Sequence, residues 1–346
     1  MTKSKKNLLR IGFIAISIIC TAIFTPWIFL RIWLTPLPDT VQEQVDEAMN
    51  YGLDGMIVYV DQQGHEPGFY ASGWKNRENK IPAKPDDLFK IASISKLYIA
   101  AATVRLVHEQ RLSLDKTLAE YLPDLAQRIE YADQITLQML IQHRSGIPNF
   151  TDEPDFPWDN PPKGNRVAVA PILDKPADFK PDASYSYSNT NYVLIGEIMD
   201  RTLGYSHHQY IKETILAPLG LTHTFSTLGD VDPEKVTSGY YVGYEPDIKM
   251  NDYSLPGGSM VATAEDVGIF LRALIDGTLL TDEEQAIYSE VYGYEHTGLL
   301  PGYQSIARYH ADIDAVVIEF TNTSGAKSWT IAEILYKRIV RILENR

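Results

Sequence analysis

The chain has 346 residues, a formal net charge of −14, one cysteine and 45% hydrophobic residues. This composition is that of an ordinary globular protein, long enough for one compact two-lobed enzyme with a substantial core. The acidic balance argues against nucleic acid as a partner and makes dense polyanions poor substrates. One cysteine cannot form an intrachain disulfide, so the hydrophobic core must hold the fold.

The first thirty-five residues predict a membrane anchor. Four basic residues, Lys3, Lys5, Lys6 and Arg10, precede an uncharged apolar run over residues 11–30. A helix of that length, rising about 1.5 Å per residue, spans a hydrocarbon core of roughly 30 Å. A cleaved signal peptide is the alternative, but the small residues after Cys20 form a poor cleavage site, and the apolar run continues beyond them.

The basic flank should stay in the cytoplasm, which gives a single-pass protein of the cell membrane. Residues 1–35 would be the cytoplasmic tail and transmembrane helix, and the domain over residues 36–346 would be extracytoplasmic.

Hydrophobic periodicity predicts an α+β fold for that domain. Alternating residues predict two hairpins, one over residues 55–61 and 68–74, the other over residues 303–310 and 315–322. Expected helices cover residues 93–110, 265–274 and 328–343, and a mainly helical lobe covers about 112–253. Strands at both ends of the chain suggest one antiparallel sheet flanked by helices and completed by the two termini. A cleft would lie between sheet and lobe.

The most informative motif is Ser93-Ile94-Ser95-Lys96, at the start of the helix predicted over residues 93–110. A hydroxyl and an amine three residues apart share one helical face, and the first turn of a helix favours developing negative charge. If Lys96 is partly desolvated, it can lose its proton near neutral pH and activate Ser93 as a nucleophile.

On its own this spacing is weak, because about one such match is expected by chance. A second copy, Ser324-Gly325-Ala326-Lys327, is interpreted as accidental because it contains a glycine and opens the C-terminal helix.

Two further triplets follow Ser93 along the chain, Tyr187-Ser188-Asn189 and His296-Thr297-Gly298. A tyrosine and an amide two residues apart on a loop can both point into one cleft, the phenol as proton acceptor and the amide as a positioning group. Because tyrosine is normally protonated at pH 7, this acceptor role needs nearby cations such as Lys96. The last triplet resembles the end of an exposed strand, where the N–H of Leu299 could join that of Ser93 as an oxyanion hole.

Together these motifs resemble the serine β-lactamase and penicillin-binding protein family, in the branch of class C β-lactamases, serine DD-carboxypeptidases and related esterases. The resemblance covers the chain from about Asn50 to its end. Three longer segments support it, Leu140-Ile141-Gln142-His143-Arg144-Ser145-Gly146-Ile147-Pro148, Tyr187-Ser188-Asn189-Thr190-Asn191-Tyr192-Val193-Leu194-Ile195-Gly196 and Gly257-Gly258-Ser259-Met260-Val261-Ala262-Thr263-Ala264-Glu265-Asp266-Val267.

The resemblance implies a role for each motif residue. Ser93 would be the acylated nucleophile, Lys96 its activating amine and Tyr187 the group that handles protons, while Asn189 would bond Lys96 or the substrate amide. His296 stands where many β-lactamases have lysine, which weakens a role in efficient antibiotic hydrolysis. Substrate-binding residues would be Thr297, Gly298 and Leu299.

Other histidines have simpler interpretations. His143 is expected to bond backbone and fix its own loop, and His207-His208 lacks the context of a metal site. If His296 acts through its charge, the rate should vary between about pH 5 and 8.

The sequence therefore predicts a membrane-anchored, extracytoplasmic serine hydrolase that needs no cofactor or metal. Expected substrates are small peptides, esters or β-lactam-like amides, with the D-alanyl end of peptidoglycan peptides favoured. Two alternatives remain, a receptor that β-lactams acylate without release, and a scaffold that kept the fold and lost catalysis.

Overall fold

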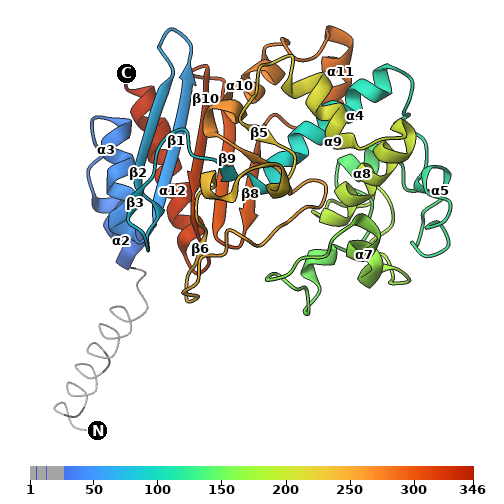
Figure 1. Cartoon of the computed structure of the whole chain (residues 1–346), viewed down its shortest axis with the longest axis horizontal. Coiled ribbons are helices and arrows are strands. Elements are labelled where there is room, and N and C mark those ends of the chain that lie inside the picture. Colours follow the sequence, from blue (N-terminus) through green and yellow to red (C-terminus); the bar gives the residue numbers. More distant parts are fainter. Residues whose placement is uncertain (1–4, 6–12, 14–26) are drawn as a thin grey trace. The chain divides into compact units, whose positions relative to one another are not determined.

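The computed structural model describes Lys5, Phe13 and residues 27–346 (Figure 1). The chain divides into two units, residues 1–39 and 40–346. Helix α2 (Trp27–Leu34) lies in the first unit. Most of the predicted membrane span over residues 11–30 lies outside the described residues and stays a prediction. Within the described residues, no helix is both long enough and apolar enough to cross a membrane.

A six-stranded antiparallel sheet forms one half of the second unit, in the order β3-β2-β1-β10-β9-β8. Its strands are β1 (Gly55–Gln62), β2 (Gly68–Asn76), β3 (Ile81–Pro82), β8 (His296–Leu300), β9 (Tyr303–His310) and β10 (Ala315–Thr321). Both predicted hairpins are confirmed, β1 with β2 and β9 with β10. Because β1 pairs with β10, segments from near both ends of the chain form the middle of one sheet.

Helices cover both faces of this sheet (Figure 1). On one face α12 (Ser328–Glu344) packs beside α3 (Val41–Ala48), and Tyr336 donates a hydrogen bond to the carbonyl of Val317 on β10. On the other face lies α10 (Ala264–Ile275), where Gly268 leaves room for the ring of Tyr59 on β1. The two central strands are therefore covered on both sides, which explains their nearly continuous apolar sequence.

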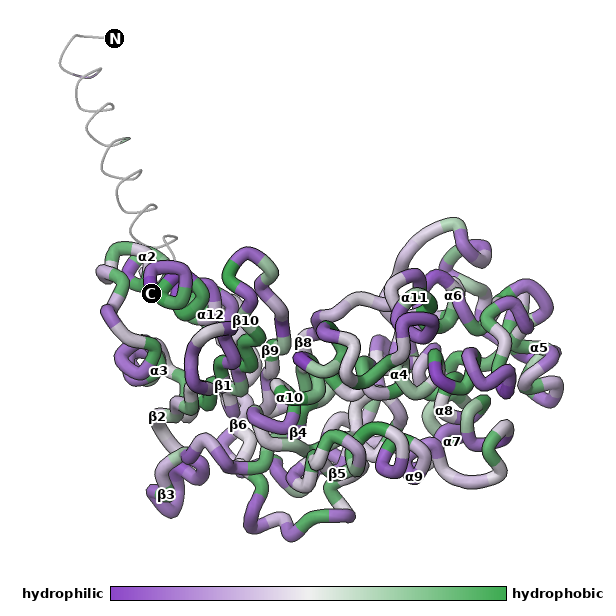
Figure 2. Tube along the Cα trace, turned by 90° about the horizontal axis from the view of Figure 1, so that it is seen from above, coloured by the Kyte–Doolittle hydropathy of each residue, from purple (hydrophilic) through white to green (hydrophobic). Residues whose placement is uncertain are grey.

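The other half of the unit is mainly helical and surrounds α4 (Ser95–His108). Eleven of the 14 residues of α4 are buried, as expected for the central helix of a core. Around it lie α5 (Leu118–Tyr121), α6 (Leu137–Ile141), α7 (Asn165–Val169), α8 (Asn189–Leu203), α9 (His207–Ile211) and α11 (Asp282–Val291). Figure 2 shows that hydrophobic residues follow α4 and the central strands of the sheet. This region extends beyond the predicted range of 112–253, because α4 packs against both α8 and α11.

Two small sheets and several single turns complete the unit. One sheet joins β4 (Phe89–Lys90), β7 (Val261–Ala262) and β5 (Thr224–Phe225), and the other pairs β11 (Thr323–Ser324) with β6 (Tyr240–Tyr241). The short helical turns are η1 (Met49–Tyr51), η2 (Ala92–Ile94), η3 (Phe150–Asp152), η4 (Ala170–Ile172), η5 (Lys212–Leu216), η6 (Leu228–Asp230) and η7 (Pro233–Lys235). The predicted α+β class, with an antiparallel sheet and flanking helices, is confirmed.

Candidate active site

Ser93 lies in η2, between strand β4 and helix α4. The predicted α-helix from Ser93 begins instead at Ser95, because the chain leaves β4 through a tight turn in which Ala92 has φ +51°. This left-handed conformation is unfavourable for alanine and needs support from its surroundings. Ser95 Oγ bonds the carbonyl of Ala92 at 2.6 Å, and Ser305 Oγ on β9 bonds that of Ile91 at 3.0 Å. The serine is thus held between helix and sheet.

Lys96 is buried beside Ser93 and makes three hydrogen bonds. Its Nζ lies 3.1 Å from Ser93 Oγ, 2.9 Å from Asn189 Oδ1 and 2.7 Å from the carbonyl of Gly257. Burial lowers the pKa of Lys96 to about 7, because the cation loses its hydration and gains no carboxylate partner among these three groups. The serine and the amine therefore meet as the spacing predicted, and Lys96 can be neutral at physiological pH.

The middle motif lies on the other side of Ser93. Tyr187 Oη donates to Ser93 Oγ at 2.8 Å, and Asn189 is the first residue of α8. The Asn189 amide is fixed at both ends, since Oδ1 accepts from Lys96 and Nδ2 donates to Thr151 Oγ1 at 3.0 Å. Burial raises the pKa of Tyr187 well above its ordinary value, so the phenol is protonated in the resting site. The predicted proton acceptor is therefore a donor here, and Lys96 is the better base.

Strand β8 is an edge strand of the large sheet and carries the third motif. Burial lowers the pKa of His296 to about 4, helped by the nearby Lys96, so the ring is neutral between pH 5 and 8. The predicted dependence on His296 charge in that range is not supported. Nδ1 of His296 lies against the carbonyl of Thr297, which favours a proton on that nitrogen.

Gly298 brings β8 into contact with the Ser93 turn. A methyl group at this position would overlap the carbonyl oxygen of Ile91 and Ser305 Oγ, and would lie 3.0 Å from Ala92 Cβ. The Ile91 carbonyl oxygen and Ser305 Oγ cannot move apart to make room, because they are hydrogen-bonded to each other. Glycine is therefore needed here for close approach, although its φ is not positive.

We expect Gly298→Ala to lower kcat/KM by at least about tenfold and to destabilise the fold by about 1–3 kcal/mol, because the added methyl pushes β8 away from Ser93. The matched control is Gly293→Ala, since a methyl there meets no atom within 4 Å and the backbone needs no positive φ. Steady-state kinetics and thermal unfolding of both variants check this. Equal activity of the two variants would mean that β8 does not position the reaction.

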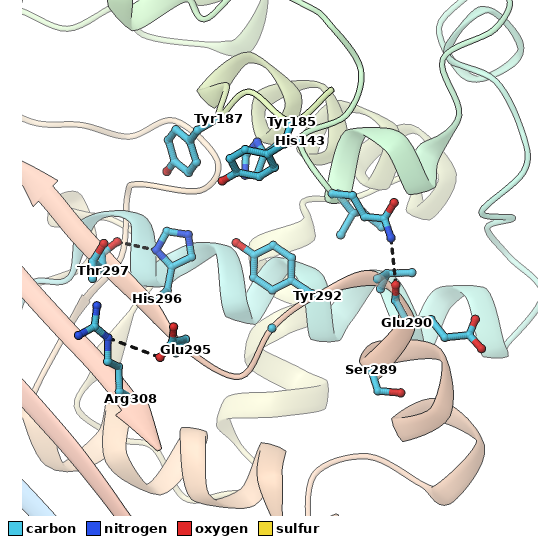
Figure 3. A pocket seen from close by; sticks show the side chains of 14 residues that line it. His143, Tyr185, Tyr187, Ser289, Glu290, Tyr292, Glu295, His296, Thr297 and Arg308 are labelled. Atoms are coloured by element: carbon cyan, nitrogen blue, oxygen red, sulfur yellow. Dashed lines mark hydrogen bonds and ion pairs between the residues drawn. The ribbon is translucent and has the colours of Figure 1, made fainter. Parts of the chain in front are cut away.

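Ser93 lines one pocket, and its hydrogen-bond partner Tyr187 lines another. The first, here called the apolar pocket, has a volume of about 70 Å³ and is lined by Ser93, Asn189, Leu299 and four aromatic side chains, Phe150, Phe156, Trp158 and Tyr253. The second, here called the tyrosine pocket, has a volume of about 640 Å³. Its lining includes His143, Tyr185, Tyr187, Tyr292, His296, Thr297, Glu290, Glu295 and Arg308 (Figure 3). A substrate at Ser93 can thus place different groups on the two sides.

Sequence reasoning missed two supports of this site, the carbonyl of Gly257 and the side chain of Lys90. The loop that provides the Gly257 carbonyl to Lys96 is also fixed by Lys90, whose buried Nζ donates to the carbonyls of Lys249 and Asn251 at 2.5 and 2.7 Å. Burial lowers the pKa of Lys90 to about 7. The available signal was a lysine inside the apolar run before Ser93.

His143 behaves as predicted. Its Nδ1 accepts the N–H of Ser188 at 3.1 Å and its carbonyl accepts that of Ser186, so it links its own loop to the Tyr187 segment. Over the residues described, no group of three or more His, Cys, Asp or Glu side chains could hold a metal ion, and the expectation of a metal-free reaction stays a prediction.

Comparison with known proteins identifies the family. The family model described as "Beta-lactamase" matches residues 39–291, about three quarters of the chain. The chain belongs to the Beta-lactamase family. This Beta-lactamase family member is 26% identical to Protein flp of Staphylococcus aureus (strain N315) over 258 residues, 69% of this chain and 50% of flp. It is also 28% identical to Penicillin-binding protein 4* of Bacillus subtilis (strain 168) over 194 residues, 54% of this chain and 41% of that protein. The chain spans about half the length of the curated relatives it matches.

Among solved structures, this Beta-lactamase family member resembles the D-amino acid amidase of Ochrobactrum anthropi SV3 in complex with L-phenylalanine amide. The TM-score is 0.77 with 25% identity, over 88% of this chain and 97% of the amidase. The predicted relationship to the β-lactamase and penicillin-binding protein family is confirmed, together with its fold.

Proposed function

We propose that this chain is a serine hydrolase that forms an acyl-enzyme on Ser93. The observation that carries the proposal is that Ser93 Oγ lies within hydrogen-bond reach of both Lys96 Nζ and Tyr187 Oη, at 3.1 and 2.8 Å. A neutral amine can accept the serine proton, and a protonated phenol can donate one. Base and acid thus meet at one nucleophile with the protonation states that acyl transfer needs.

In the proposed acylation, Ser93 Oγ attacks the substrate carbonyl and its proton passes to Lys96. As the tetrahedral intermediate collapses, the bond to the leaving group breaks and Tyr187 gives that group a proton. The proton now on Lys96 then returns to Tyr187 through a water, because Ser93 Oγ is esterified at this stage and cannot carry it. In the second half, water attacks the acyl group while neutral Lys96 accepts its proton. The bond between the acyl carbon and Ser93 Oγ then breaks, and Ser93 Oγ takes a proton from Lys96 or Tyr187.

The oxyanion would be bound by the N–H groups of Ser93 and Leu299. Strands β8 and β9 are joined by a two-residue turn, with Leu300 opposite Tyr303 and Leu299 opposite Gln304. In an antiparallel ladder, hydrogen-bonded and non-hydrogen-bonded pairs alternate. Because Leu300 and Tyr303 flank the turn as a bonded pair, Leu299 and Gln304 form a non-bonded pair, and the N–H of Leu299 is directed away from β9. The contact of Gly298 with Ile91 and Ala92 brings this edge close to Ser93.

The proposed substrates are amides or esters of small acyl groups, including those related to D-alanyl peptides. Two comparisons support this choice, the likeness to a D-amino acid amidase and to a penicillin-binding protein. The apolar pocket, with its aromatic wall, suits an uncharged acyl side chain. The roles of Thr297, Gly298 and Leu299 in binding the substrate are part of this proposal.

We also propose that residues 11–30 anchor the chain in the cell membrane with the hydrolase unit outside. The support is the uncharged apolar run behind four basic residues. Fractionation of cells that produce the full chain, followed by protease treatment from outside, checks this. Release of the intact chain into the soluble fraction would contradict a retained anchor.

Intact-protein mass spectrometry tests the reaction. The full chain is mixed with a p-nitrophenyl ester, a D-Ala-D-Ala peptide and a β-lactam, and adducts are followed over time. A transient adduct on Ser93 with released product is expected. A permanent β-lactam adduct without turnover of the other compounds would favour the receptor, and no adduct with any compound would favour the inactive scaffold.

Tyr187→Phe should lower turnover by roughly 10²-fold, because it removes the proton donor while leaving the ring in place. Covalent labelling of Ser93 by a fluorophosphonate should persist, since Lys96 still activates the serine. Steady-state kinetics and labelling rates of this variant check whether turnover falls while labelling persists. An unchanged turnover number would move the proton donation to Lys96.

A further inference from the structure

We propose that the tyrosine pocket binds a positively charged leaving group, of the substituted ammonium type, and disfavours a carboxylate. This inference rests on the proposed hydrolase function and narrows the substrate class of that site. Among the proposed D-alanyl substrates it favours esters and amides with a cationic leaving group, and it makes D-Ala-D-Ala peptides, whose leaving group carries a carboxylate, poor substrates.

The position assigns this pocket to the leaving group. Tyr187, which would protonate the departing atom, lies on its wall together with His296 and Thr297 of β8. The apolar pocket instead contains Ser93 itself and Asn189. When Ser93 attacks, the acyl side chain and the leaving group point in different directions from the same carbon. The group next to the proton donor is the one that departs.

The wall of the tyrosine pocket is a series of aromatic rings that touch one another (Figure 3). The ring centroid of His143 lies 6.0 Å from that of Tyr185 and 4.5 Å from that of Tyr187. The ring centroid of His296 lies 6.2 Å from those of both Tyr187 and Tyr292. All five rings are uncharged at neutral pH, since burial lowers the pKa of His143 to about 3 and that of His296 to about 4. Aromatic faces attract cations, and clusters of such rings recognise substituted ammonium groups.

The charges on the pocket wall also favour a cation over a carboxylate. Glu290 and Glu295 both line the pocket, and both are exposed. Among the lining residues, all of which the structure describes, Arg308 is the one lysine or arginine. Its Nε lies 3.5 Å from Glu295 Oε2, and its Nη2 lies 3.8 Å from Glu333 Oε1. A carboxylate that entered would have to compete with these two glutamates for Arg308, whereas an ammonium group would meet carboxylates and ring faces.

Three esters with one acyl group and different alcohols test the preference. The acyl group is N-acetyl-D-alanyl, and the alcohols are choline, the uncharged isostere 3,3-dimethylbutanol, and glycolate. With the full chain, we expect kcat/KM for the choline ester to exceed that for the dimethylbutyl ester by about tenfold. The glycolate ester should be the poorest of the three. Equal values for choline and dimethylbutyl esters, or a preference for glycolate, would overturn the proposal.

Two variants locate the preference without touching the proposed catalytic groups. Tyr185→Ala removes a ring that is 62% exposed on the pocket wall, and Glu290→Gln removes a charge. Each should reduce the choline preference, measured as the ratio of kcat/KM for the choline ester to that for the dimethylbutyl ester, at least threefold. Tyr205→Ala is the matched control, because Tyr205 is an exposed tyrosine that lines none of the pockets described. A preference that survives in both pocket variants would place the cation elsewhere and refute the proposal.

Calorimetric binding to the Ser93→Ala variant separates this inference from the hydrolase itself. That variant cannot form the acyl-enzyme, so the affinities of the choline and dimethylbutyl esters report on the pocket alone. Tighter binding of the choline ester, lost with Tyr185→Ala, supports the cation site even if the native chain hydrolyses neither ester. Equal affinities would reject the cation site even if both esters are hydrolysed.

Discussion

Ser93→Ala is expected to lower kcat by at least about 10⁴-fold and to abolish covalent labelling by a fluorophosphonate. The hydroxyl is the atom on which both Lys96 and Tyr187 converge, so its removal eliminates the acyl-enzyme and leaves only direct attack by water. The free energy of unfolding should change by only about 1 kcal/mol. Two hydrogen bonds to Ser93 are lost, but Lys96, one of the two donors, keeps its bonds to Asn189 and to the carbonyl of Gly257. Product assays, intact mass after labelling and thermal unfolding measure the three effects.

Ser289→Ala is the matched control for that variant. Ser289 lines the tyrosine pocket, but its Oγ bonds only the carbonyl of Ala286 within its own helix, at 2.8 Å. Its removal should leave both labelling and turnover unchanged. Labelling that persists in Ser93→Ala and disappears in Ser289→Ala would identify a different nucleophile and reject the proposed reaction.

The second large effect concerns Lys96. Because burial lowers its pKa to about 7, the amine is protonated below this pH and cannot accept the serine proton. Above it, the amine is neutral and the reaction proceeds. We therefore expect kcat/KM to rise about tenfold from pH 6 to pH 8 and then to level off, as measured with an ester whose own charge is constant. Lys96→Met should lower activity by at least about 10³-fold at every pH.

His296→Gln distinguishes the lysine from the nearby histidine. The pKa of His296 is about 4, so this ring does not change its charge between pH 6 and 8. The midpoint of the activity profile should therefore stay near pH 7 in this variant, whatever its effect on the absolute rate. A profile that becomes flat would assign the titration to His296 and not to Lys96.

The residues of the site were predicted with different kinds of information. Ser93 and Lys96 were found because three residues along a helical turn fix their separation, and the hairpins were found because side chains alternate along a strand. Tyr187, Asn189 and His296 were singled out by the chemistry of their motifs, and the resemblance of these motifs to a family then joined them to Ser93 in one site. Lys90 and the carbonyl of Gly257 were not assigned roles, since one buried lysine or one backbone oxygen leaves no periodic pattern.

The sequence by itself therefore determined the two hairpins, the helix that carries Lys96 and the local pairing of Ser93 with Lys96, because these depend on neighbours a few residues apart. Only the tertiary structure decided the protonation of the site. Burial by segments about 90 to 160 residues away lowers the pKa of Lys96, keeps Tyr187 protonated and leaves His296 neutral. The same long-range packing forms the tyrosine pocket, whose walls come from the loop after α6, the loop before α8 and the α11–β8 segment. Desolvation depends on what surrounds a group in space, and that information is not contained in local spacing.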